Sequence, residues 1–200
     1  MMQSIATVSK RFRADRRGAA AIEFAFIAPI LFVLYFMTME VSQAIETNKK
    51  VGRIASIVGD LIAQQRNGVP RTDVDNILDI GAAIIQPYGP PLPTIIVEHI
   101  WIEADTPNPK AYVTWSRKLE GTNKSQAVAP NSETQVPEQL KVADTYLVRV
   151  TTKLGYKPII AWNDDQKSAL GLASAFSILN MSEQYYLRPR MSQKIDCNGC

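Results

Sequence analysis

The chain has 200 residues, of which 46% are hydrophobic and 20% charged, and its formal net charge is +3. These totals are ordinary for a folded protein and indicate one domain of modest size. Before position 18 the basic residues outnumber the acidic ones five to one. The rest of the chain is therefore close to neutral, which argues against a nucleic-acid-binding surface. The basic residues of this leader are Lys10, Arg11, Arg13, Arg16 and Arg17.

An apolar segment follows from Ala19 to Met39, 21 residues in which only Glu23 is charged. About 20 mostly apolar residues are needed for a helix to cross the hydrocarbon core. Because the basic residues precede the segment, we expect a cytoplasmic N-terminus and translocation of everything after Met39. An ordinary secretory signal peptide cut near Ala44 is the alternative, but the apolar run exceeds the usual signal core of about 7–15 residues.

Glu23 is unusual because a carboxylate at the centre of a membrane helix costs about 2.5–3.5 kcal/mol. Cutting the chain after Gly18 would supply a cationic partner, since the new α-amino group of Ala19 would have a pKa of about 7.7–8.0. Glu23 would then pair with the amine of a neighbouring subunit inside the membrane. In the alternative reading, Glu23 lies near the cytoplasmic headgroups and reaches water.

Pro29 lies inside the apolar segment. Proline has no N–H, so the carbonyl of Ala25 loses its usual donor and a kink is expected if the helix continues. Membrane helices tolerate such kinks when neighbours or water satisfy the freed group. The sequence leaves open whether this kink is merely tolerated or acts as a hinge in assembly.

The spacing from Gly18 to Glu23, followed by an apolar helix, resembles the prepilin-peptidase site of type IV pilin-like proteins. The stretch "RRGAAAIEFAFIAPILF" resembles the TadE-like minor pseudopilins of tight-adherence (Flp-type) pilus systems. "VRVTTKLGYKPII" and "YYLRPRM" are similar to the C-terminal strands of that family. The resemblance implies cleavage between Gly18 and Ala19, a bacterial inner-membrane location with a periplasmic C-terminal domain, and a role in adhesion. The implied partners are a second pseudopilin, the major pilin, the prepilin peptidase and the pilus platform machinery.

The remaining pattern predicts an α+β fold of the pilin-like kind: a long transmembrane and amphipathic helix, a short helix, and an antiparallel β-sheet domain. Apolar residues at intervals of three and four extend the first helix to Gln65. A second helix is expected at about 73–86, with Thr72 as its N-cap and Asp75 as the acidic third position. Strands are predicted at 94–105, 110–121 and 144–156, with one or two more in 172–189, and a polar loop at 121–139. The expected divisions are a leader at 1–18, the helix at 19–66 and a globular domain at 67–200.

No catalytic residue, metal ligand set or cofactor is predicted. His99, the only histidine, lies in the middle of a predicted strand and is interpreted as a structural residue. Asp164 and Asp165 are interpreted as a solvated turn rather than a calcium site. Cys197 and Cys200 end the chain as a C-x-x-C, for which a disulfide that holds the tail is favoured over pairing with another chain.

The leading functional hypothesis is therefore a structural, non-enzymatic pilus subunit. One alternative is an uncleaved single-span anchor that displays a periplasmic β-rich binding domain. Another is a secreted enzyme or binding protein freed by cleavage near Ala44.

Overall fold

The computed structural model describes residues 18–66, 68–86, 91–104, 108–158 and 179–200. The leader up to Arg17 and the Asp164–Asp165 pair lie outside the described residues. The chain divides into two compact units, Met1–Gln43 and Ala44–Cys200. Helix α2 (Ala19–Ala63) begins in the first unit and ends in the second, close to the predicted end at Gln65.

In the second unit, α2 buries one face. Its side chains at intervals of three and four are fully buried, as the amphipathic pattern predicts. These residues are Val51, Ile54, Ala55, Val58 and Ile62. They pack together with the inner side of helix α3 (Arg71–Ala83), where Val74, Ile77 and Leu78 are buried.

The predicted N-cap of the second helix is wrong. Helix α3 begins at Arg71, its N-cap position is Pro70, and no side chain caps it. The carboxylate of Asp75 is used elsewhere, because it accepts two hydrogen bonds from the Arg117 guanidinium at 2.7 and 2.9 Å. This pairing across the helix–sheet boundary holds the pKa of Asp75 below its usual range.

The sheet is antiparallel throughout, with the strand order β4-β3-β2-β6-β7. Its long strands are β2 (Thr94–Ile102), β3 (Ala111–Glu120), β6 (Tyr146–Tyr156) and β7 (Leu179–Leu187). The stretch predicted as a polar loop at 121–139 contains two short strands and a 3-10 turn. They are β4 (Asn123–Ser125) and β5 (Ser132–Thr134), which both pair with β3, and η2 (Glu138–Leu140).

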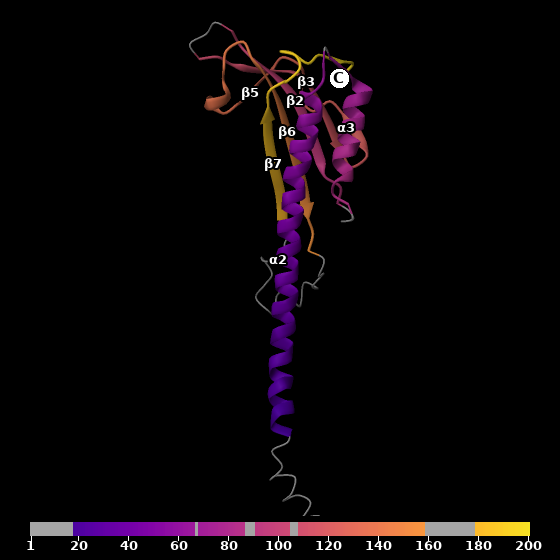
Figure 1. Cartoon of the computed structure of the whole chain (residues 1–200), viewed down its shortest axis with the longest axis vertical. Helices are drawn as coiled ribbons and strands as arrows, with labels where there is room; N and C mark the ends of the chain where they lie inside the picture. Colours follow the sequence, from indigo (N-terminus) through magenta and orange to yellow (C-terminus); the bar gives the residue numbers. More distant parts are fainter. Residues whose placement is uncertain (1–17, 67, 87–90, 105–107, 159–178) are drawn as a thin grey trace, which may run out of the picture. The chain divides into compact units, whose positions relative to one another are not determined.

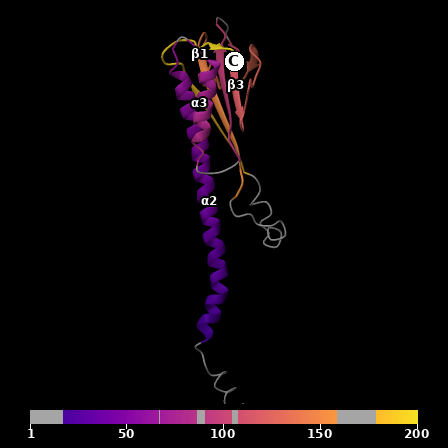
Figure 2. The same ribbon diagram turned by 90° about the vertical axis from the view of Figure 1, so that its right-hand side faces the viewer.

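Within the second unit, α3 and the adjoining part of α2 lie side by side on one face of the sheet (Figures 1 and 2). The main core lies between these helices and inward-facing strand residues such as Ile95, Val97, Trp115 and Val150. On the other face, Arg149 donates to both carboxylate oxygens of the buried Glu98, at 2.6 and 2.8 Å. The predicted α+β fold, with a long helix, a short helix and an antiparallel sheet, is confirmed.

Candidate functional site

The proposed processing site lies where α2 begins. Gly18 is the residue immediately before the helix and is exposed. A Cβ atom built on Gly18 meets no other atom within 4 Å, so the peptide bond that follows is sterically open on this side. The small residue and the open surroundings are what an extended peptide needs to enter a protease cleft.

The first part of α2 exposes large apolar side chains on every side of the helix. Its most apolar window has a mean hydropathy of 2.2, and none of that window is buried. The side chains that are at least half exposed include Ile22, Phe24, Phe26, Ile27, Ile30, Leu31, Phe32, Leu34 and Tyr35. A helix that is apolar all round must be covered by protein or lipid to be stable. Within the described residues, α2 is the one helix long and apolar enough to cross a membrane.

Glu23 and Pro29 both lie inside this apolar part of α2. Glu23 is exposed, and no cation among the described residues lies within ion-pair distance of it. The helix continues through Pro29 to Ala63. Because proline lacks an N–H, the carbonyl of Ala25 has no helical donor at this point. Among the described residues, the apolar surface therefore carries one carboxylate without an ion-pair partner, and Pro29 deprives one backbone carbonyl of its helical donor.

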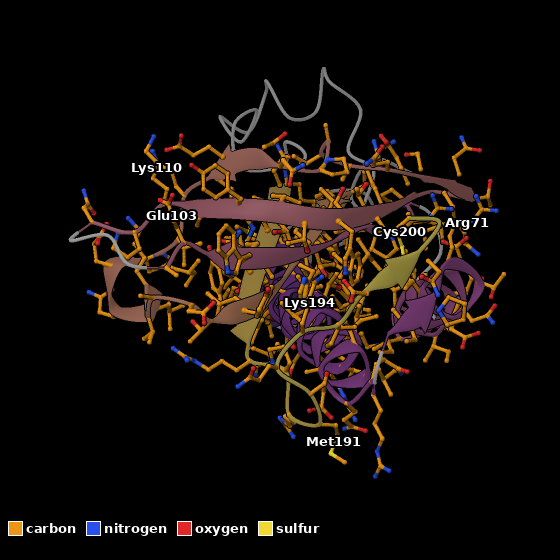
Figure 3. The ribbon with its side chains drawn as sticks, turned by 90° about the horizontal axis from the view of Figure 1, so that it is seen from above. Arg71, Glu103, Lys110, Met191, Lys194 and Cys200 are labelled. Carbon is orange, nitrogen blue, oxygen red and sulfur yellow. A yellow bond between two sulfur atoms is a disulfide. The ribbon has the colours of Figure 1, made fainter. Side chains whose placement is uncertain are left out.

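A second feature is the C-terminal segment 190–200, which crosses the end of the globular unit. Its backbone is attached at several places: the N–H of Arg190 donates to the carbonyl of Ala63 at 2.9 Å, and the N–H of Val69 donates to the carbonyl of Asp196 at 2.8 Å. Strand β8 (Cys197–Asn198) pairs in parallel with β1 (Val69–Pro70). A disulfide joins Cys197 to Cys200, whose Cα atoms are 5.7 Å apart. Figure 3 shows Lys194, Cys200 and the projecting side chain of Met191 on this segment.

His99 attaches the same segment from inside the core. The side chain of His99 is fully buried and stacks between the rings of Trp115 and Tyr146. The hydroxyl of Thr114 donates to the carbonyl of His99, so it accepts from Nδ1–H at 2.6 Å. The remaining nitrogen, Nε2, accepts the backbone N–H of Ile195 at 3.4 Å, while the indole N–H of Trp115 donates to the carbonyl of Ile195 at 2.7 Å.

These contacts require a neutral imidazole. Burial lowers the pKa of His99 to about 4, with opposing smaller effects from the charges of Asp196 and Lys194. A proton on Nε2 would face the Ile195 N–H, which is another donor. His99 is therefore a structural residue with both nitrogens satisfied and no access to solvent. In the part of the chain that the structure describes, no cluster of three or more His, Cys, Asp or Glu residues could hold a metal ion.

The described residues therefore form an α+β protein in which one helix, apolar on every side of its first part, is long and apolar enough to cross a membrane. The family model described as "TadE-like protein" matches residues 18–56, from the glycine before α2 into its amphipathic part. The predicted resemblance to the TadE-like family is thereby confirmed over these residues. This family is a structural and assembly family. Comparisons with curated proteins and with solved structures gave no match.

The sequence singled out Gly18, Glu23, Pro29 and the two cysteines. In the structure Glu23 and Pro29 lie on α2, Gly18 immediately precedes it, and a disulfide joins the cysteines near the C-terminus. It missed the attachment of the C-terminal segment to His99 and Trp115. His99 and Trp115 lie opposite each other on β2 and β3. Nothing in the sequence around them indicates that His99 contacts Ile195, 96 positions later in the chain.

Proposed function

We propose that the protein is a minor pseudopilin, a structural subunit or an assembly and priming factor of a tight-adherence type IV pilus. We further propose that a prepilin peptidase cuts it between Gly18 and Ala19. The observation that supports this best is the start of α2: an unhindered glycine is followed directly by a helix whose apolar side chains are exposed on every side. Such a helix is suited to pack against other apolar helices once it leaves the lipid.

In this proposal the N-terminus is cytoplasmic and the unit Ala44–Cys200 is periplasmic. The support is the cluster of basic residues before Gly18, because positively charged flanks are retained in the cytoplasm. An oxidising compartment also suits the Cys197–Cys200 disulfide. The protein would meet the prepilin peptidase and the platform machinery at the inner membrane.

Cleavage would create a cation at Ala19, four residues before Glu23. The two groups are then separated by about 6 Å along the helix axis, at 1.5 Å per residue. A pair between the Glu23 carboxylate of one subunit and the Ala19 amine of the next is best formed when the two helices are staggered by about this amount. Two helices at the same level would bring like groups together. The pair would therefore set the register between this subunit and a second pseudopilin or the major pilin.

The processing step is tested by the mass and N-terminal residue of the protein recovered from cell membranes. We expect a chain that begins at Ala19. Gly18→Val should leave the full-length chain, since a β-branched side chain disfavours entry into the cleft, while among the described residues no atom lies within 4 Å of a Cβ at this position. Ala25→Val, an equivalent change at an exposed position farther along α2, should be cut normally. Full-length wild-type protein in the membrane would instead support an uncleaved anchor and would refute the processing step.

The pairing role is tested separately with Glu23→Gln, which keeps the shape of the side chain and removes its charge. We expect normal cleavage but reduced incorporation into sheared pili. Glu46→Gln, on the exposed surface of α2 beyond the apolar part, is the matched control and should be incorporated normally. Equal incorporation of the wild type and Glu23→Gln would remove the ion pair from the proposal.

A further inference from the structure

The two edges of the sheet are built differently. On one side, the outer edge of β3 is covered by two strands of three residues each, β4 and β5. On the other side, β7 has nine residues and, among the described residues, pairs only with β6. Its nine pairs run without a bulge from Val148↔Leu187 to Tyr156↔Leu179. Natural edge strands are usually blunted by shortness, lysine, proline or bulges, and β7 has none of these.

A groove of about 460 Å³ runs beside this edge, between α2 and β7. We call it the α2–β7 groove. Gly52 leaves room at its centre, because a Cβ atom built there would lie no closer than 3.7 Å to the hydroxyl of Tyr185. The groove is lined by Asn48, Lys49, Gly52, Arg53 and Ser56 of α2 and by Glu183 and Tyr185 of β7.

The α2–β7 groove carries an excess of positive charge. Lys49 and Arg53 are exposed, four residues apart on the same side of α2, and neither forms an ion pair among the described residues. The one carboxylate of the groove, Glu183, already accepts a hydrogen bond from Asn48 at 3.3 Å. Lys49 and Arg53 therefore face the groove without an ion-pair partner among the described residues.

The spacing of these cations matches a β-strand. Asn48 contacts Glu183, and Gly52 faces Tyr185, so α2 advances four residues while β7 advances two. Four helical residues rise about 6 Å, and two strand residues rise about 6.6 Å. A strand added beside β7 would therefore bring side chains at alternate positions level with Lys49 and then with Arg53.

We propose that the edge of β7 and the α2–β7 groove bind an extended segment of a different protein, one with carboxylates at alternate positions. The segment adds to the sheet as a strand, and its carboxylates pair with Lys49 and Arg53. A second copy of this chain fits less well. Its β7 offers one carboxylate only, and antiparallel pairing centred on Glu183 would place two like charges opposite each other.

This proposal does not depend on cleavage after Gly18, and it is tested with the full chain in a non-ionic detergent. The probe is a fluorescent nine-residue peptide in which glutamate alternates with valine, and the control peptide has lysine in place of glutamate. We expect the glutamate peptide to bind at least about tenfold more tightly than the lysine peptide, with an affinity that falls as salt rises. Its binding should slow hydrogen exchange of the β7 backbone amides that point away from β6.

Charge reversal at the groove, Lys49→Glu with Arg53→Glu, should weaken binding of the glutamate peptide at least about tenfold. The matched control, Arg66→Glu with Arg71→Glu, changes two exposed cations away from the groove and should leave binding unchanged. Unchanged tryptophan fluorescence would show that both variants are folded. The proposal is overturned if the two peptides bind equally, or if the outward-facing amides of β7, which do not donate to β6, are protected from exchange before any peptide is added. The proposal is also overturned if the protein self-associates through β7. The same holds if Lys49→Glu with Arg53→Glu leaves peptide binding unchanged and weakens only binding to micelles that contain the anionic lipid phosphatidylglycerol.

Discussion

The neutral His99 predicts a specific loss of stability in mild acid. The pKa of His99 is lowered from 6.5 to about 4 in the folded protein, because burial of the ring disfavours its charged form. Between these two values the unfolded chain binds a proton that the folded chain excludes, so the stabilisation is fully present above about pH 6.5 and is lost as the pH falls towards 4. This lowering of the pKa from 6.5 to about 4 corresponds to about 3 kcal/mol in the free energy of unfolding. About 2 kcal/mol of this should be lost between pH 7 and pH 5.

The assay is urea unfolding of the full chain in non-ionic detergent, followed by tryptophan fluorescence. All three tryptophans lie beyond Gln43, so the signal reports the globular unit and not the apolar part of α2. Ordinary carboxylates titrate below this range, which isolates the histidine. His99→Gln keeps a polar side chain without an ionisable proton, and its stability, although lower at pH 7, should change little between pH 7 and pH 5. An equal loss in both proteins would refute the assignment of this pH dependence to His99.

Two further predictions concern the packing of the globular unit. A Cβ atom at Gly81 would lie 2.5 Å from Cγ2 of the buried Val58, so Gly81→Ala should lower the free energy of unfolding by about 1–2 kcal/mol. A Cβ atom at Gly52 meets no such contact, so Gly52→Ala should raise the free energy of unfolding by up to about 1 kcal/mol. The same urea assay distinguishes them, and a stabilised Gly81→Ala would contradict the packing. Arg149→Met leaves the buried Glu98 carboxylate unpaired and should lower the free energy of unfolding by about 3–5 kcal/mol. Combining it with Glu98→Gln should lower the free energy of unfolding by less, because no buried charge is then left unpaired. Equal losses in the two proteins would show that the unpaired charge is not the cause.

The parts of the fold that were predictable are those with a repeated pattern. The burial of Val51, Ile54 and Val58 follows from their helical spacing, and β2 and β6 begin within two residues of their predicted starts. Strands β4 and β5 were missed because three residues are too few to show an alternation. Their pairing with β3 is a consequence of the sheet and not of their own sequence.

The cap of α3 illustrates a different limit. A threonine followed three residues later by an acid is a common helix start, and Thr72 with Asp75 fits it. The prediction failed because Asp75 has a stronger partner in Arg117, which is 42 positions away in the chain and donates two hydrogen bonds to it. A charged bidentate pair outweighs a single side-chain cap, and only the folded sheet brings the guanidinium into reach.

The two halves of α2 show how one helix can be stable in two surroundings. Up to Met39 the apolar side chains point in all directions and are exposed, so their burial must come from lipid or from other chains. From Val51 onward the apolar side chains occupy one face and are buried in the globular unit. Polar residues such as Glu46 and Lys49 lie between these regions, and Ile45 is the last exposed large apolar side chain before them. A change that shortens the first half should therefore affect membrane insertion without unfolding the sheet, because the hydrophobic core formed by the described residues of the second unit begins at Val51.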